Sequence, residues 1–135
     1  MDSPGIYSFK LFKPEINRKF CEEIKNIQKF FANNKNKIPS SKPNPQNNYG
    51  VILNYFGFDA MITSLIKEIC TPLFKCLWQG IGEDSIDHYD AFSMEYSPAK
   101  DVHLPTHLDD SEITLNYCLG TGFEGGLLEF SGVKC

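Results

Sequence analysis

The chain has little arginine, a deficit of positive charge and no long apolar run. Arg18 is the only arginine among 135 residues, and 13 basic residues against 17 acidic ones leave a net charge of -4. Nucleic acids and anionic membranes attract basic surfaces, so this balance argues against both as partners. No stretch approaches the roughly 18 apolar residues of a transmembrane helix, and Met1–Phe12 lacks the basic start and apolar segment of a signal peptide. These absences predict a cytoplasmic protein, or a nuclear one.

The cysteines lack any recognisable spacing. There are five, an odd number that follows no zinc or redox pattern: Cys21, Cys70, Cys76, Cys118 and Cys135. Reduced thiols are expected rather than a disulfide framework. Apolar and charged fractions of 41% and 22% are ordinary for a globular protein, and a chain of this length buries one core. A single domain over residues 1–135 is therefore predicted.

The first 46 residues read as a helical and loop lead-in. Alternating polarity over Ile6–Phe12 predicts a strand, and Pro14 suits the first turn of a helix. The apolar stripe of that helix recurs every three or four residues and ends near Asn33; it consists of Ile16, Phe20, Ile24, Ile27 and Phe31. The polar, proline-punctuated residues 33–48 predict a loop.

A second group of elements follows the loop. Val51–Phe56 is a predicted strand, and Asp59 is placed to cap the next helix. That helix has an apolar stripe made of Ile62, Leu65, Ile66, Ile69, Leu73 and Leu77. Pro72 should kink or divide the helix, because proline removes an interior hydrogen bond. Ala91–Tyr96 is the next predicted strand.

The residues that carry chemistry lie at His107-Leu108-Asp109. Side chains two apart on an extended chain share one side, so this imidazole and carboxylate can reach the same divalent ion, and they supply two of the three ligands of a 2-His-1-carboxylate Fe(II) site. The tripeptide alone is weak evidence, because His88-Tyr89-Asp90 repeats it. The continuation favours the second copy: Ile113–Leu119 alternates in polarity like a strand, and Gly125-Gly126 opens a further apolar segment, Leu127–Phe130.

This region carries a resemblance to a known family. HLDDSEITLNYCLGTGFEGGLLEFSGVKC closely resembles the 2-oxoglutarate- and Fe(II)-dependent oxygenases of the prolyl-4-hydroxylase type, including uncharacterised oxygenase-domain proteins with an HxDDSExTLNxCLG block. Upstream, NNYGVILNYFGFDAMITSLIKEICTPLF and AFSMEY extend the resemblance back to about Asn47. It implies that residues 47–135 form an incomplete oxygenase core. The implied architecture is α+β, with N-terminal helices packed on a partial double-stranded β-helix (a cupin-like jelly roll).

The resemblance also implies a set of ligands and residue roles. His107 and Asp109 would bind Fe(II), and Tyr96 would line the pocket of the cosubstrate 2-oxoglutarate, although a tyrosine facing solvent or core is equally open. Thr114, Asn116 and Cys118 share one strand face by parity and are implied cosubstrate contacts. The implied reaction uses O2 to hydroxylate a peptidyl proline, a lysine or a small molecule, with succinate and CO2 as co-products and L-ascorbate (vitamin C) as reductant. His103, Asp110 and Glu112 are more simply solvated loop residues.

One departure from the family pattern is clear. No histidine follows His107, and Lys134 is the only basic residue after Asp109, whereas the family takes a third ligand and a basic cosubstrate anchor from later strands. Two explanations are open: these residues are the front part of a longer product, or the chain is a shortened, inactive relative that acts as an interaction module. A cupin-like zinc or manganese enzyme is a further alternative. In isolation the 135-residue chain is expected to be marginally stable or self-associating, because its sheet edges would be open.

Overall fold

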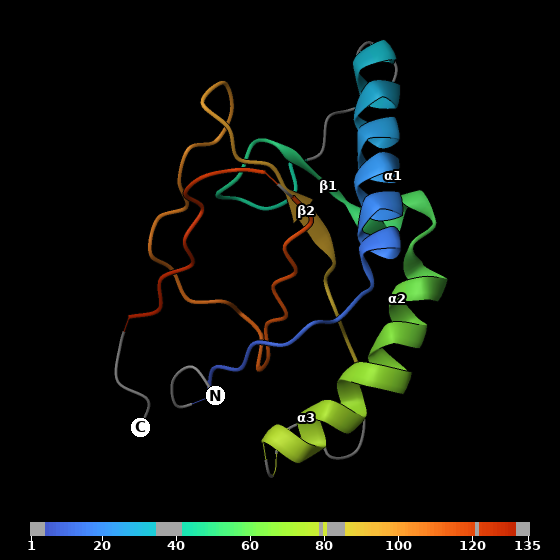
Figure 1. Cartoon of the computed structure of the whole chain (residues 1–135), viewed down its shortest axis with the longest axis vertical. Coiled ribbons are helices and arrows are strands. Elements are labelled where there is room, and N and C mark those ends of the chain that lie inside the picture. The colour runs from blue at the N-terminus through green and yellow to red at the C-terminus, as the bar shows by residue number, and fades with distance from the viewer. Residues whose placement is uncertain (1–4, 35–41, 79, 81–85, 121, 132–135) are drawn as a thin grey trace.

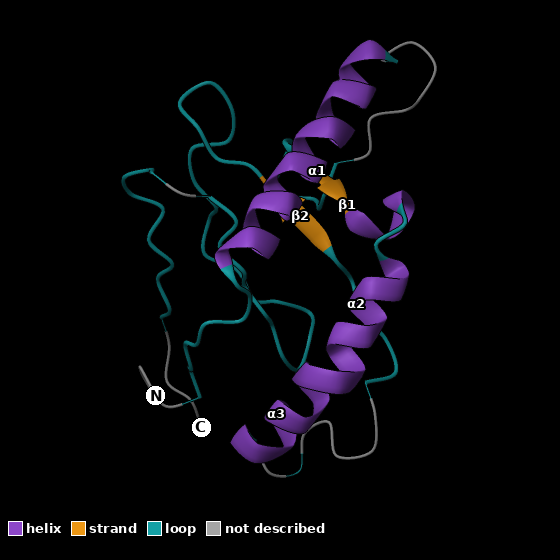
Figure 2. Cartoon of the chain, turned by 45° about the vertical axis from the view of Figure 1, so that its right-hand side comes forward, coloured by secondary structure: helices purple, strands orange, loops and turns teal. Residues whose placement is uncertain are grey.

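A computed structural model describes residues 5–34, 42–78, 80, 86–120 and 122–131. A long helix, α1, lies beside a small antiparallel sheet of strands β1 and β2, and a second helical stretch leads away from the sheet (Figures 1 and 2). The described residues that follow β2 run as loops on the side of the sheet opposite this second stretch (Figure 1). The class is therefore mixed α+β. Within the described part of the chain, no helix combines the length and apolar character needed to cross a bilayer.

Helix α1 spans Pro14–Asn33, as its apolar periodicity predicted. Proline begins the helix without loss because the first backbone N–H groups have no helical partner. Glu15 adds a favourable charge at the positive end of the helix dipole. Ile24 and Ile27 form the buried face of the helix. This face is what attaches α1 to the sheet.

Strands β1 (Gly50–Ile52) and β2 (Phe92–Met94) pair antiparallel, with Val51 opposite Ser93. Val51 is only 2% exposed and forms the centre of the core with the buried face of α1. Around it pack half-buried apolar side chains from several segments: Phe31, Leu53, Phe56, Phe58 and Leu119. The strand predicted at Ala91–Tyr96 is thus confirmed at its centre.

The strand predicted at Val51–Phe56 is only partly right. It begins at Gly50 and ends at Ile52, and Leu53–Phe56 forms a 3₁₀ turn instead. Gly57 follows with a φ of 77°, a conformation that glycine adopts without steric cost, so the chain turns there rather than extending. Gly50 has its own requirement: a Cβ at this position would lie 1.9 Å from the backbone oxygen of Ser93.

The second helical stretch is divided near Pro72, as predicted. Helix α2 (Asp59–Leu65) passes into a π-helical turn, η2 (Ile66–Cys70), and helix α3 (Thr71–Leu77) begins with Pro72 in its first turn. The wider π turn accommodates a residue that cannot donate to the preceding carbonyls. The stretch buries Ile62, Cys70 and Phe74, and burial raises the pKa of the Cys70 thiol.

The predicted capping role of Asp59 is wrong. Phe58 occupies the N-cap position and makes no side-chain capping bond, while Asp59 is the first helical residue. Its carboxylate instead accepts hydrogen bonds from Asn54 Nδ2 at 3.0 Å and from the Tyr89 hydroxyl at 3.2 Å. The side chain joins α2 to the segment before β2, and its charge still favours the helix N-terminus.

Three predicted strands form no ladder. Ile6–Phe12 is irregular apart from a bridge at Ile6, and Ile113–Leu119 and Leu127–Phe130 pair with no strand among the described residues. A strand needs a hydrogen-bonded neighbour as well as the right residues, and the described residues supply only the single β1–β2 pair. The part of the chain that the structure describes therefore does not show the two facing sheets that a jelly roll requires.

Candidate metal centre

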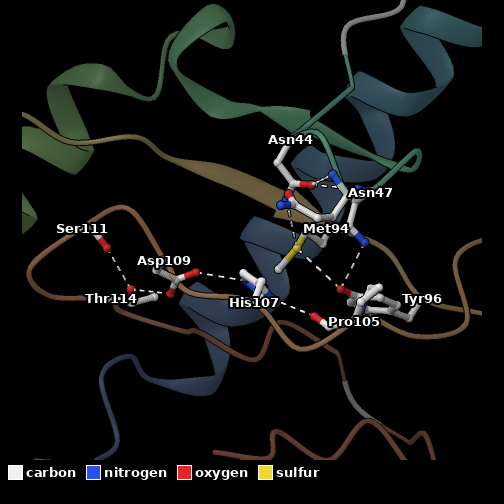
Figure 3. A network of polar contacts seen from close by, with 10 residues as sticks. Asn44, Asn47, Met94, Tyr96, Pro105, His107, Asp109, Ser111 and Thr114 are labelled. Carbon is white, nitrogen blue, oxygen red and sulfur yellow. Dashed lines mark hydrogen bonds and ion pairs between the residues drawn. The ribbon is translucent and has the colours of Figure 1, made fainter.

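His107 and Asp109 come together in the loop that follows β2. The Nε2 atom of His107 lies 3.1 Å from Oδ1 of Asp109, and their side chains are 33% and 46% exposed. Figure 3 shows the two side chains directed toward each other across the intervening residue. The predicted proximity of the two side chains is therefore present even though the loop is not a strand.

The other ring nitrogen of His107 contacts the backbone. Nδ1 lies 2.9 Å from the backbone oxygen of Pro105, and a carbonyl oxygen can only accept, so Nδ1 carries the proton. In neutral imidazole this leaves Nε2 with a lone pair directed at a carboxylate oxygen. Two acceptors face each other at 3.1 Å, and a cation or a proton between them is needed to make the contact favourable.

The second oxygen of Asp109 is also engaged. Thr114 Oγ1 donates to Oδ2 of Asp109 at 2.6 Å, and Ser111 Oγ lies 3.0 Å from the same threonine hydroxyl. Because Thr114 donates to the carboxylate, Ser111 is the donor of the pair. A run of hydrogen bonds thus holds one carboxylate oxygen and leaves the other turned to His107 (Figure 3).

This pair fits two positions of a ferrous ion. Metal bonds of about 2.1 Å at right angles bring neighbouring ligand atoms to about 3 Å apart, which matches the observed 3.1 Å. A carbonyl-anchored Nδ1–H and a hydrogen-bonded carboxylate are the usual outer supports of such ligands. Among the residues that the structure describes, no third histidine, cysteine or carboxylate joins the pair. The described residues therefore bring one imidazole and one carboxylate together at a spacing compatible with two positions around one metal ion.

The second H-x-D motif is arranged differently. His88 Nε2 lies 3.7 Å from Oδ1 of Asp90, and these side chains are 80% and 82% exposed. The two motifs share only the H-x-D pattern, and in the motif that begins at His107, Pro105 and Thr114 contact the histidine and the aspartate. His103, the remaining histidine, is exposed.

The predicted cosubstrate residues fall in different surroundings. Thr114 contacts Asp109, as described, whereas Asn116 is exposed and Cys118 is exposed with its thiol 3.7 Å from the Gly120 oxygen. The predicted parity holds only in part: these three side chains are exposed and Ile113, Tyr117 and Leu119 are half-buried, but Leu115 on the second face is 40% exposed.

Tyr117 anchors the buried side of this segment. Its ring packs edge-on against Phe12, with centroids 5.1 Å apart. Desolvation raises the pKa of the Tyr117 phenol, and the nearby thiols of Cys21 and Cys118 raise it further. Cys21 in α1 also donates to the Leu119 oxygen. The exposed face with the candidate residues is thus held from behind by α1 and by the chain before it.

Tyr96 belongs to a second cluster that sequence reasoning missed. Its hydroxyl accepts from Nδ2 of Asn47 at 3.1 Å, and Asn47 also donates to Oδ2 of Asp101. The backbone N–H groups of Gln46 and Asn47 donate to Oδ1 of Asn44, at 3.0 and 2.7 Å. An asparagine that accepts from the backbone two and three residues on is a recognised turn signal, so the PNPQNN stretch could have revealed this turn.

Asp101 ties the cluster together. Its carboxylate accepts from the backbone N–H groups of Asn48 at 2.7 Å and Tyr49 at 3.1 Å, and from the amide of Asn48. Desolvation raises the pKa of this carboxyl, but the hydrogen bonds from Asn48, Tyr49 and Asn47 outweigh it and hold the pKa below its ordinary value. Asp101 thereby joins the loop before β1 to the loop after β2.

Known proteins similar to the chain agree on its class. Relatives include 2-oxoglutarate and iron-dependent oxygenase domain-containing protein ICU11 of Arabidopsis thaliana, 38% identical over 98% of this chain, and 2-oxoglutarate and iron-dependent oxygenase domain-containing protein 2 of Xenopus tropicalis, 36% identical over 96%. The Homo sapiens protein of the latter name is 33% identical over 95% of the chain. The matches cover 33%, 36% and 35% of those proteins, so the chain spans about a third of the length of the curated relatives it matches.

The N-terminal part of the chain identifies its family. Residues 1–83 match the OGFOD2-like domain, and the chain therefore belongs to the OGFOD2-like family of 2-oxoglutarate and iron-dependent oxygenase domain-containing proteins. No solved structure matches the chain.

Proposed function

We propose that the chain provides His107 and Asp109 as two Fe(II) ligands of a 2-oxoglutarate-dependent dioxygenase that hydroxylates a peptidyl proline or lysine side chain or a small molecule. The observation that supports this most directly is the distance of 3.1 Å between Nε2 of His107 and Oδ1 of Asp109. The names of the relatives, which mention iron and 2-oxoglutarate, support this choice of metal and cosubstrate. The proposal includes completion of a jelly roll by further strands, L-ascorbate as reductant, and succinate and CO2 as co-products.

The chain's own residues have distinct tasks in this proposal. Pro105 holds the histidine ring in the tautomer that presents a lone pair, and Thr114 holds the carboxylate. Tyr96 would offer a phenol hydroxyl to the cosubstrate, and Asn116 and Cys118 would contact it as well. When bound, ferrous iron with 2-oxoglutarate and O2 supplies the oxidising power for C–H hydroxylation, and the protein contributes geometry and exclusion of water.

Metal titration tests the ligand assignment. Anaerobic addition of Fe(II), followed by 2-oxoglutarate, should produce a visible charge-transfer band and succinate upon admission of air. His107→Ala and Asp109→Ala should each weaken Fe(II) binding by more than about tenfold, because one of two protein ligands is lost.

The chain contains a matched control for this experiment. His88→Ala removes a histidine from an identical H-x-D motif whose atoms lie farther apart, and it should leave Fe(II) affinity unchanged. Equal effects of His88→Ala and His107→Ala would contradict the assignment. Absence of both metal binding and succinate would instead favour an interaction module, which the two-ligand count among the described residues also favours.

A further inference from the structure

A fully buried asparagine, Asn47, lies next to the tyrosine proposed to contact the cosubstrate. Asn47 is 0% exposed, and its Nδ2 group donates to the Tyr96 hydroxyl at 3.1 Å and to Asp101 Oδ2 at 3.4 Å. The amide group thus donates both of its hydrogens, each to a residue about fifty positions later in the chain. Figure 3 shows Asn47 between the Asn44 turn and the Tyr96 ring.

The orientation of this amide is determined by its surroundings. Its backbone N–H donates to Asn44 Oδ1, and rotation of the side-chain amide would place its oxygen against the Asp101 carboxylate. The Oδ1 atom is buried and has no hydrogen-bond partner among the described residues. An unpaired buried carbonyl is costly, and an apolar side chain would avoid that cost, so the value of Asn47 lies in its two donated bonds.

These bonds decide what the Tyr96 hydroxyl can do. Because its oxygen accepts from Asn47, its own hydrogen remains free to be donated. In the structure the hydroxyl donates to the Met94 sulfur, with oxygen and sulfur 3.6 Å apart, and a thioether is a weak acceptor that a carboxylate can replace. Tyr96 is 43% exposed, so a ligand can reach it.

We infer that Asn47 is a positioning residue: by donating to the Tyr96 hydroxyl oxygen, it keeps the hydroxyl hydrogen available for donation to a carboxylate of 2-oxoglutarate in place of the Met94 sulfur. This inference rests on the proposed function. Asn47 touches neither metal nor cosubstrate and acts through the tyrosine.

A double-mutant cycle tests the link. The affinity for 2-oxoglutarate is measured on the full chain from the anaerobic Fe(II) charge-transfer band, for wild type, Asn47→Leu, Tyr96→Phe and the double variant. The Asn47→Leu change keeps a similar side-chain volume but removes the two N–H donors. If the leucine variant does not fold, Asn47→Ala is used in its place. Each single change should weaken binding about tenfold, and the double variant should be no weaker than Tyr96→Phe. Additive losses of about a hundredfold, or no effect of Asn47→Leu, would overturn the inference.

A second readout is independent of the cosubstrate. In protein labelled with ¹³Cζ-tyrosine, the Tyr96 resonance is assigned by its loss in Tyr96→Phe. Asn47→Leu should shift this resonance, whereas the exposed control Asn116→Ala should not. If wild-type protein gives no charge-transfer band, the proposed function is refuted, but the contact between Asn47 and Tyr96 is still tested by the resonance. A Tyr96 resonance that does not shift in Asn47→Leu would refute that contact.

Discussion

At the scale of single residues, the hydrogen bonds around Asp109 indicate a different role for Thr114 from the one predicted. Strand parity grouped Thr114 with Asn116 and Cys118, but its hydroxyl donates to Asp109 at 2.6 Å. A contact to the proposed metal ligand gives this threonine a supporting task that its two companions do not share in the structure. The sequence offered no signal of it, because a bond between residues five apart depends on the turn at Ser111.

Substitution of Thr114 tests this supporting task. Thr114→Val removes the hydroxyl at nearly constant shape and should weaken metal affinity by about tenfold, the lower end of what such outer contacts contribute. Thr114→Ser keeps the hydroxyl and should retain the affinity within about twofold. Fe(II) or Co(II) titration measures both. Similar affinities for the valine and serine variants would show that the hydroxyl does not support Asp109.

Asp101 predicts a pH dependence of stability. Its pKa is lower in the folded chain than in the unfolded chain, where the pKa of an aspartate is about 3.9. Its contribution to stability is therefore complete above that pH and is lost as the pH falls through the folded value. Urea unfolding between about pH 3 and 6 should show wild-type stability falling at the acid end, and Asp101→Asn should remove part of that slope.

Asp110 provides the control for Asp101. It is exposed, and no hydrogen bond to its carboxylate occurs among the described residues, so Asp110→Asn should keep the wild-type slope. An Asp101→Asn profile that parallels the wild type down to pH 3 would contradict the role given to the Asn48 and Tyr49 hydrogen bonds.

At the scale of elements, helices followed their sequence signals more closely than strands did. Helix α1 begins at Pro14 and ends at Asn33, as predicted, because a helix satisfies its hydrogen bonds within itself and needs only one apolar face. The division at Pro72 was equally predictable from the missing N–H. Ile113–Leu119 has an equally clear alternation, yet it forms no ladder because a strand depends on a neighbour elsewhere in the chain.

The β1–β2 pair predicts a large penalty at Gly50. Gly50→Ala would place a Cβ 1.9 Å from the Ser93 oxygen in the paired strand, and neither backbone can move without breaking the ladder. We expect a loss of more than about 3 kcal/mol in the free energy of unfolding. Gly57→Ala is the matched control: it also has positive φ but meets nothing within 4 Å, so the loss should be about 1 kcal/mol. Equal losses in urea unfolding would contradict the close approach of the strands.

At the scale of the whole molecule, a small core contrasts with a large exposed apolar surface. The buried apolar side chains among the described residues are Ile24, Ile27, Val51, Ile62, Cys70 and Phe74. By contrast, Leu108 is 96% exposed, Leu127 is 87% exposed and Phe130 is 62% exposed. Apolar surface of this kind, in segments with unpaired backbone, promotes association between chains.

Self-association of the isolated 135-residue chain follows from this contrast. Sedimentation at micromolar concentration should show oligomers, and circular dichroism should show a shallow thermal transition below about 60 °C. Leu127→Glu should reduce association, whereas Tyr55→Glu, at a position 71% exposed in the 3₁₀ turn, should not. A sharp transition well above about 60 °C in a monomer would contradict the expectation.

Sequence alone predicted the family, from its motifs. It also predicted the two long helical segments and the proximity of His107 to Asp109, because both depend on residues close together in the chain. Tertiary structure decided the roles of Asn47, Asp101 and Thr114 and the early end of β1. It also decided that Ile113–Leu119 pairs with no strand among the described residues. The physical reason is one of range. Periodicity and H-x-D spacing act within a few residues, whereas a buried amide that joins residues fifty positions apart exists only once the chain has folded.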